Sequence, residues 1–80
     1  MTVTVLLFAS YADAIGQREI PLDLPNGSTV GEAVRRIREM AGATQLPAAP
    51  LVAVNEEYAR ADRALAAGDE MAIIPPVAGG

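Results

Sequence analysis

Apolar positions near the start of the sequence alternate with a period of two, which is typical of β-strands. Residues 2–8 form an apolar run rich in β-branched side chains, and its last residues are apolar on both faces. We therefore expect a central strand here. Residues 17–24 also alternate, but they contain Pro21, which cannot donate a backbone hydrogen bond to a neighbouring strand. The pattern predicts that this second strand lies at an edge of the sheet and pairs antiparallel with the first.

The middle of the chain changes to the helical period of about 3.6 residues. Thr29 followed by Glu32 is a capping box, which predicts that a helix begins here, and Gly42 is the expected end. A shorter helical turn is expected over residues 9–15, ended by Gly16. The long helix has one apolar stripe, made of Val30, Ala33, Val34, Ile37, Met40 and Ala41.

The second half of the sequence predicts short strands joined by turns. Residues 51–54 are an apolar run, residues 55–57 form a turn that leads to Tyr58, and residues 70–74 follow the turn signal Gly68-Asp69. The whole order predicts an α+β fold, a β-grasp (ubiquitin-like) roll with a mixed sheet of four to five strands and one main helix across one face. In such a roll the first and last strands pair in parallel at the sheet centre, which agrees with their apolar character.

The segment after the last strand has a composition of its own, so we divide the chain into a domain, residues 1–74, and a tail, residues 75–80. Two consecutive prolines lack backbone donors, so we expect an extended tail that leaves the sheet. Six extended residues reach at most roughly 20 Å. Gly79 and Gly80 have no Cβ, so the tip is thin and suits a narrow active-site channel. The alternative is a frayed tail without function, although charged and polar residues usually dominate such tails.

A single long helix leaves the other face of the sheet open to water or to another protein. In the first strand Leu6 and Phe8 share a face with two threonines, and in the last strand Ile74 shares a face with Glu70. The polar members indicate that this face is the open one. An exposed apolar patch beside a tail is typical of a docking surface, unless neighbouring loops cover it. The predicted docking patch consists of Leu6, Phe8, Ile74 and, with a register that the pattern does not determine, Tyr58.

Composition excludes several kinds of active site. The sequence contains no Cys, His, Lys or Trp, which excludes catalytic triads, thiolate or histidine metal sites and iron–sulfur clusters within this chain. A net charge of −4 does not favour nucleic acid. We expect a cytoplasmic protein that binds no membrane, nucleic acid, metal or cofactor of its own. The helix residues Arg35, Arg36 and Arg38 alternate with acids, so we interpret them as a solvated face.

Several segments together resemble the small, sulfur-carrying subunits of molybdopterin synthase, which belong to the ubiquitin-like sulfur carriers. The similarity spans nearly the whole chain, and its most specific part is the Pro-Pro-Val-Ala-Gly-Gly ending. A more distant similarity is to the sulfur carrier of thiamine thiazole synthesis. The last strand departs from the family pattern, because Ile73-Ile74 stands where aromatic residues are common. The segments that carry the resemblance are 5–9, 29–32, 52–55, 68–70 and 74–80.

The resemblance implies a chemistry for the tail. An ATP-dependent, E1-like activating enzyme adenylates Gly80, and a sulfur donor such as a cysteine desulfurase displaces AMP to leave a thiocarboxylate. The sulfur then passes to precursor Z (cyclic pyranopterin monophosphate) in the large synthase subunit, within an assembly of two small and two large subunits. Gly79 provides the narrow approach, and the stalk consists of Pro75, Pro76, Val77 and Ala78.

The family reading makes this chain a sulfur-donating subunit that is not catalytic alone, because the partner supplies the acids and bases. Three alternatives remain open. The chain could carry sulfur for thiamine, tRNA thiolation or cysteine synthesis, it could be a ubiquitin-like modifier attached to lysines, or it could be an interaction module whose tail does no chemistry.

Overall fold

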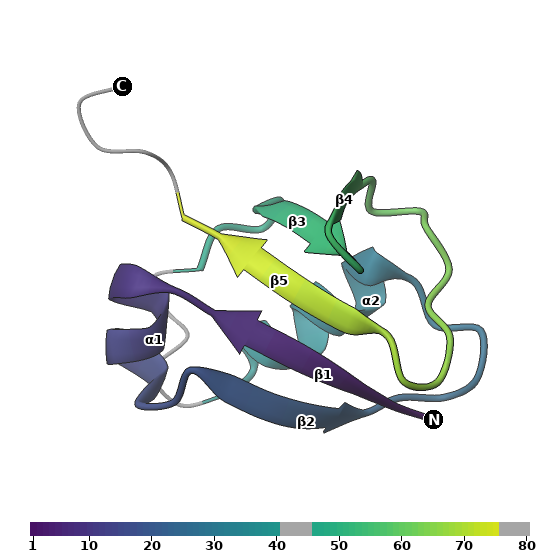
Figure 1. Ribbon diagram of the computed structural model, residues 1–80, viewed down its shortest axis with the longest axis horizontal. Helices are drawn as coiled ribbons and strands as arrows, with labels where there is room; N and C mark the ends of the chain where they lie inside the picture. The colour runs from purple at the N-terminus through teal and green to yellow at the C-terminus, as the bar shows by residue number, and fades with distance from the viewer. Residues whose placement is uncertain (41–45, 76–80) are drawn as a thin grey trace.

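The computed structural model describes residues 1–40 and 46–75, which form one mixed sheet with α2 behind it and α1 at one end (Figure 1). The elements in chain order are β1 (Thr2–Leu7), α1 (Ala9–Ile15), β2 (Glu19–Asp23), α2 (Val30–Arg38), β3 (Leu51–Val54), β4 (Glu57–Ala59) and β5 (Glu70–Ile74). The expected α+β roll of the β-grasp type is confirmed.

The sheet has five strands in the order β2-β1-β5-β3-β4. Strands β1 and β5 pair in parallel near the centre, as the sequence predicts, and the other neighbouring pairs are antiparallel. Pro21 lies on the edge strand β2 opposite Thr4. Between β1 and β2, Leu7 N donates a hydrogen bond to Arg18 O, and Leu24 N donates one to Met1 O. Opposed residues of an antiparallel pair are hydrogen-bonded at every second position, and Pro21 lies at a position between these. The backbone nitrogen of Pro21, which has no hydrogen to donate, therefore faces away from β1.

Helix α2 begins as the capping box predicts. Thr29 Oγ1 accepts a hydrogen bond from Glu32 N at 3.3 Å, and Thr29 N donates to the Glu32 carboxylate at 3.1 Å. The helix ends at Arg38, before the predicted stop at Gly42, which lies outside the described residues. The last turn tightens, since Met40 N donates to Ile37 O three residues earlier rather than four. Within this tightened end, Arg38 Nε donates to Leu46 O at 3.2 Å.

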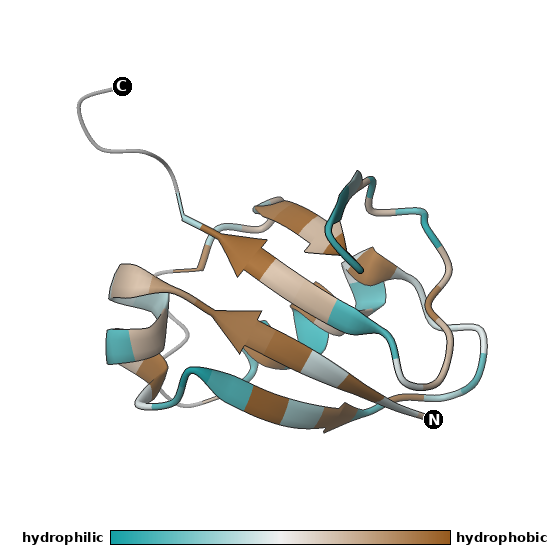
Figure 2. Cartoon of the chain, viewed as in Figure 1, coloured by the Kyte–Doolittle hydropathy of each residue, from teal (hydrophilic) through white to brown (hydrophobic). Residues whose placement is uncertain are grey.

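The core lies between α2 and one face of the sheet. Alternate residues of β1 and β5 point into it, and Figure 2 shows the apolar bands that run along these two strands. From the helix side, four residues of the predicted apolar stripe are buried, namely Val30, Ala33, Val34 and Ile37. Leu65, which follows the irregular segment after β4, is also buried. Within residues 1–40 and 46–75, no helix has the length and apolar character needed to cross a membrane.

The hairpin between β3 and β4 is tighter than the sequence indicates. The expected turn at residues 55–57 is one residue too long, because Glu57 already pairs with Val54. Asn55 and Glu56 alone form the connection, with φ values of 50° and 72°. A two-residue connection with positive φ at both positions matches the right-handed twist of the strands that it joins. This tight turn determines which side chain of β4 points to which face.

Candidate functional site

The open face of the sheet, which we define as the face opposite α2, carries one row of side chains across all five strands. Paired residues on neighbouring strands point to the same face, so the register determines the members of the row. Leu6 lies opposite Ala72, and Ala72 lies opposite Ala53. The complete row is Glu19, Leu6, Ala72, Ala53 and Tyr58. Next to it, Ile74 lies opposite Leu51. These pairings bring three of the four predicted docking residues onto one face.

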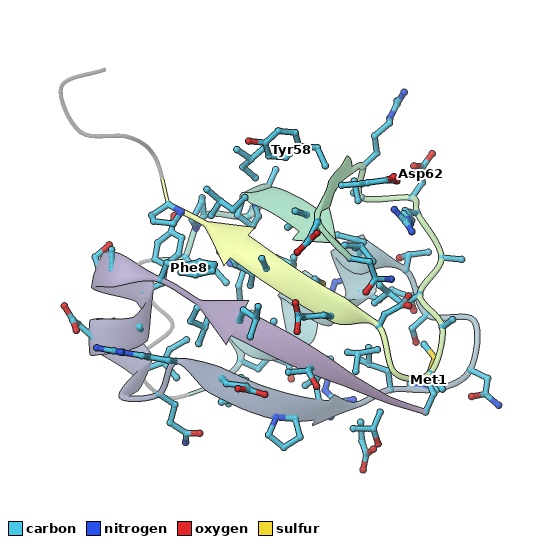
Figure 3. All side chains as sticks on the ribbon, viewed as in Figure 1. Met1, Phe8, Tyr58 and Asp62 are labelled. Atoms are coloured by element: carbon cyan, nitrogen blue, oxygen red, sulfur yellow. The ribbon has the colours of Figure 1, made fainter. Side chains whose placement is uncertain are left out.

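The fourth docking residue, Phe8, lies immediately after β1 as the N-cap of α1. Figure 3 shows its side chain beside the end of β5. Its exposed fraction is 46%, and that of Tyr58 is 73%, so both rings are available to a partner. Leu6 and Ile74 are half-buried. The predicted residues thus surround the place where the chain leaves the sheet.

Leu51 belongs to this surface, and the sequence analysis missed it. Its exposed fraction is 51%, and it lies opposite Ile74 on β3. The run Leu-Val-Ala-Val reads as a strand buried on both faces, since apolar residues occupy every position. No signal in the neighbouring sequence could have shown this, because the exposure of Leu51 depends on its pairing with the end of β5.

The predictions for the tail fall mostly outside the described residues. Strand β5 ends at Ile74, and Pro75 follows it in a half-buried position without strand pairing. The predictions lie outside the part of the chain that the structure describes for Pro76, Val77, Ala78, Gly79 and Gly80. The chain leaves the sheet from its central strand, between the partners of β5 on either side.

An open pocket of about 430 Å³ lies beside Phe8, between β1, β2 and α1. It is lined by apolar side chains from β1 and α1 and by the charged residues Asp13, Arg18 and Glu19. The turn from β1 into α1 requires Ala9 to adopt a φ of 48°, a conformation that alanine rarely takes. Phe8, just before this turn, lines the pocket and remains exposed.

A network of hydrogen bonds joins two of the segments that carry the family resemblance. Asn55 Nδ2 donates to one carboxylate oxygen of Asp69 at 3.0 Å, and Ala66 N donates to the other at 2.8 Å. Asn55 Oδ1 in turn accepts from Glu70 N at 3.0 Å. The pKa of Asp69 is lowered from its usual value of 3.8 by the hydrogen bond from Ala66, by the hydrogen bond from Asn55 and by the charge of Arg63. Partial desolvation of the carboxylate raises this pKa, but by less. The network lies at the start of β5, so its role is to hold the fold.

The described residues of the open face suit recognition by another protein. Within residues 1–40 and 46–75, no three Asp or Glu side chains gather where they could hold a metal ion. The charged side chains that the strands place on the open face are carboxylates, and the large exposed side chains are apolar or aromatic. Such a surface can bind another protein and present whatever follows Pro75 to it.

Known proteins resemble this chain in sequence and fold over nearly its whole length. The model of the ThiS family matches residues 5–80. The molybdopterin synthase sulfur carrier subunit of Dictyostelium discoideum is 38% identical over 80 residues, which cover 95% of this chain and 93% of that protein. The crystal structure of SAMP1 from Haloferax volcanii superposes with a TM-score of 0.86 at 32% identity and covers 100% of both chains.

A further structural neighbour is part of an assembly. It is the complex of subunits 1 and 2 of the molybdopterin-converting factor from Helicobacter pylori, with a TM-score of 0.73, 22% identity and 100% coverage of both chains. At this identity the likeness concerns the fold. The match of the family model over residues 5–80 and the identity to full-length relatives show that the chain belongs to the ThiS family.

Proposed function

We propose that this protein is the sulfur carrier subunit of a molybdopterin synthase. The observation that carries the proposal is the position of the last strand. Strand β5 runs through the centre of the open face and ends at Ile74 beside exposed Phe8 and Leu51. A partner that covers this apolar surface therefore also receives the residues after Pro75. The names of relatives at 32–38% identity from three eukaryotes support the same assignment.

The proposed chemistry takes place at Gly80. At neutral pH its carboxylate is ionised and is a poor acyl donor. Attack of this carboxylate on the α-phosphorus of ATP, in an E1-like activating enzyme, forms an acyl-adenylate and releases pyrophosphate. The terminal sulfur of a persulfide, on a sulfur donor such as a cysteine desulfurase, then displaces AMP to give an acyl disulfide. A thiol reductant cleaves the S–S bond, is itself oxidised to a disulfide, and leaves the thiocarboxylate on Gly80. The thiocarboxylate sulfur attacks precursor Z in the large subunit, and the carboxylate of Gly80 is restored by hydrolysis.

The proposed division of labour follows from the composition of the chain. The proposed docking residues are Leu6, Phe8, Tyr58 and Ile74. The proposed stalk consists of Pro75, Pro76, Val77 and Ala78, and the tip that enters the partner's channel consists of Gly79 and Gly80. Since the sequence has no Cys, His or Lys, the acids and bases for sulfur transfer come from the large subunit. The proposed assembly contains two small and two large subunits in the cytoplasm.

Removal of Gly80 tests this proposal most simply. We expect the deletion variant, and a variant extended by one alanine after Gly80, to lose sulfur transfer to precursor Z completely when assayed with activating enzyme, ATP, a sulfur source and the large subunit. The thermal unfolding midpoint should stay the same, because residues after Pro75 lie beyond the last strand. Sulfur transfer by the deletion variant would contradict the mechanism.

A second candidate function is that of a ubiquitin-like modifier. It is favoured by the 35% identity to small archaeal modifier protein 1 of Haloferax volcanii, which covers 92% of this chain. A modifier uses the same activated Gly80, but an amine takes the place of the sulfur donor. Isolation of proteins joined to Gly80 through an amide bond would support this candidate. Copurification with a large subunit, in the absence of such conjugates, would support the sulfur carrier.

A further inference from the structure

Charged residues are distributed unequally between the two sides of the molecule. The five strands contain no arginine, whereas α2 alone contains Arg35, Arg36 and Arg38. On the open face the charged positions are all acidic, and Figure 2 shows the hydrophilic starts of β2 and β5 where two of them lie. These open-face acids are Glu19, Asp23 and Glu70.

The register sets these carboxylates around the apolar row. Glu19 lies opposite Leu6, so it flanks the row at the edge strand β2. Glu70 lies opposite Thr4, two residues before Ala72 on the same face, so it flanks the row from the start of β5. Side chains in these relations are about 5–8 Å apart across a sheet. Asp23 is further away and its carboxylate accepts a hydrogen bond from Thr2 Oγ1 at 2.6 Å. Glu19 and Glu70 therefore border the docking patch directly.

Arg18 is a basic residue beside this border. It precedes β2, its carbonyl oxygen accepts from Leu7 N, and its side chain lines the pocket beside Phe8 together with Asp13 and Glu19. One arginine therefore faces two acids in this pocket, and Glu70 has no basic residue on its own face of the strands. The strand side chains that border the docking patch on β2 and β5 are therefore acidic, while exposed Arg60 follows β4 two residues after Tyr58.

We propose that the open face docks onto a protein surface whose apolar centre is bordered by arginine or lysine side chains, and that Glu19 and Glu70 steer the approach and set the orientation. This inference rests on the proposed function and describes the partner's surface for the same docking event. Apolar contacts in the centre of an interface supply most of the affinity, whereas complementary charges at its rim raise the association rate and exclude wrong orientations. The same acids disfavour a second copy of this chain as the occupant, because two acidic borders would meet.

Charge-reversal variants with a matched control test the proposal. Glu19→Arg, Glu70→Arg and the control Glu39→Arg each change the net charge from −4 to −2, since one negative charge is replaced by one positive charge. Glu39 is exposed at the end of α2, on the other side of the molecule. The probe is the molybdopterin synthase large subunit from the same organism, immobilised for kinetic binding measurements at low and high salt.

At low salt we expect the association rate constant to fall roughly threefold or more for Glu19→Arg and Glu70→Arg, and to stay within error for Glu39→Arg. At high salt the difference should disappear, because rim charges are screened. Equal slowing by all three variants, or no slowing by the first two, would overturn the inference while leaving the large subunit as the partner. Failure of the unaltered protein to bind would contradict the proposed function itself and remove the inference with it. Glu70→Gln, which keeps the size of the side chain, separates charge from shape and should give a smaller decrease in the same direction.

Discussion

The hydrogen bonds between Asn55 and Asp69 make a quantitative prediction about the stability of this fold. They join the β3–β4 hairpin to the loop before β5, and together these two segments hold the central strand in register. We therefore expect Asp69→Ala and Asn55→Ala each to destabilise the protein, and the two effects to be non-additive. A double-mutant cycle measures this coupling.

The expected magnitude follows from the number of bonds that each substitution removes. Asp69→Ala removes the bonds from Asn55 Nδ2 and Ala66 N, at 3.0 and 2.8 Å. Each contributes about 1 kcal/mol, because the carboxylate is charged but remains partly exposed to water. The free energy of unfolding should therefore fall by about 2 kcal/mol, which corresponds to a decrease in Tm of roughly 10 °C for a domain of this size. The coupling energy between Asn55 and Asp69 should be about 1 kcal/mol.

The pKa of Asp69 adds a dependence on pH. Because hydrogen bonds from Ala66 and Asn55 hold this pKa below 3.8, the native state favours the ionised carboxylate more than the unfolded state does. The contribution of Asp69 is thus fully present above pH 3.8 and is lost as the pH falls through the lowered native value. The difference in stability between the unaltered protein and Asp69→Asn should decrease over this range.

Urea denaturation at neutral pH and at acidic pH is the appropriate assay, with the variant Asp62→Ala as a control. Asp62 is an exposed acid in the nearby loop, and its removal should change the free energy of unfolding by no more than about 0.5 kcal/mol. If the losses from Asn55→Ala and Asp69→Ala simply add, the reasoning is refuted, since two residues that share a hydrogen bond must be coupled. Partner binding should survive in folded Asp69→Ala, because the network lies at the end of β5 opposite to Pro75.

Two further predictions concern the docking patch and the backbone beside it. In a calorimetric titration, Phe8→Asp and Ile74→Asp should each weaken binding to the large subunit by tenfold or more, which is about 1.4 kcal/mol or above. Phe8→Asp should leave Tm almost unchanged because the Phe8 side chain is exposed. Unaltered binding would show that the patch is assigned wrongly. Ala9→Gly should raise the free energy of unfolding by up to about 1 kcal/mol because Ala9 has a φ of 48°, and Gly68→Ala should lower it by a similar amount because Gly68 has a φ of 85°. Equal signs for these two substitutions in thermal unfolding would contradict the strain argument.

The fold was largely predictable because local patterns and global packing agree. Thr29 and Glu32 mark the start of α2 through hydrogen bonds that depend on only four residues of sequence. Alternation in β1 and β5 separates the core face from the open face without any knowledge of the partner strands. The end of α2 was not predictable in the same way, because the early tightening at Met40 accompanies a contact with Leu46, which lies beyond the helix.

The placement of the predicted docking residues on the open face could be predicted only where one strand determines it. Leu6, Phe8 and Ile74 follow from strand alternation, but the place of Tyr58 depends on the two-residue turn at Asn55 and Glu56. Leu51 escaped because its exposure comes from its pairing with Ile74 and not from its own sequence neighbours. The bond between Asn55 and Asp69 joins residues 14 positions apart, and no local pattern reveals such a contact.

The most direct test of the central claim is the intact mass of this protein after incubation with its activating enzyme, ATP and a sulfur source, with fragmentation of the C-terminal peptide. We expect a species in which one oxygen of Gly80 is replaced by sulfur. We also expect this species to disappear when precursor Z and the large subunit are added. A carboxylate at Gly80 that stays unchanged under these conditions would contradict the sulfur-carrier function.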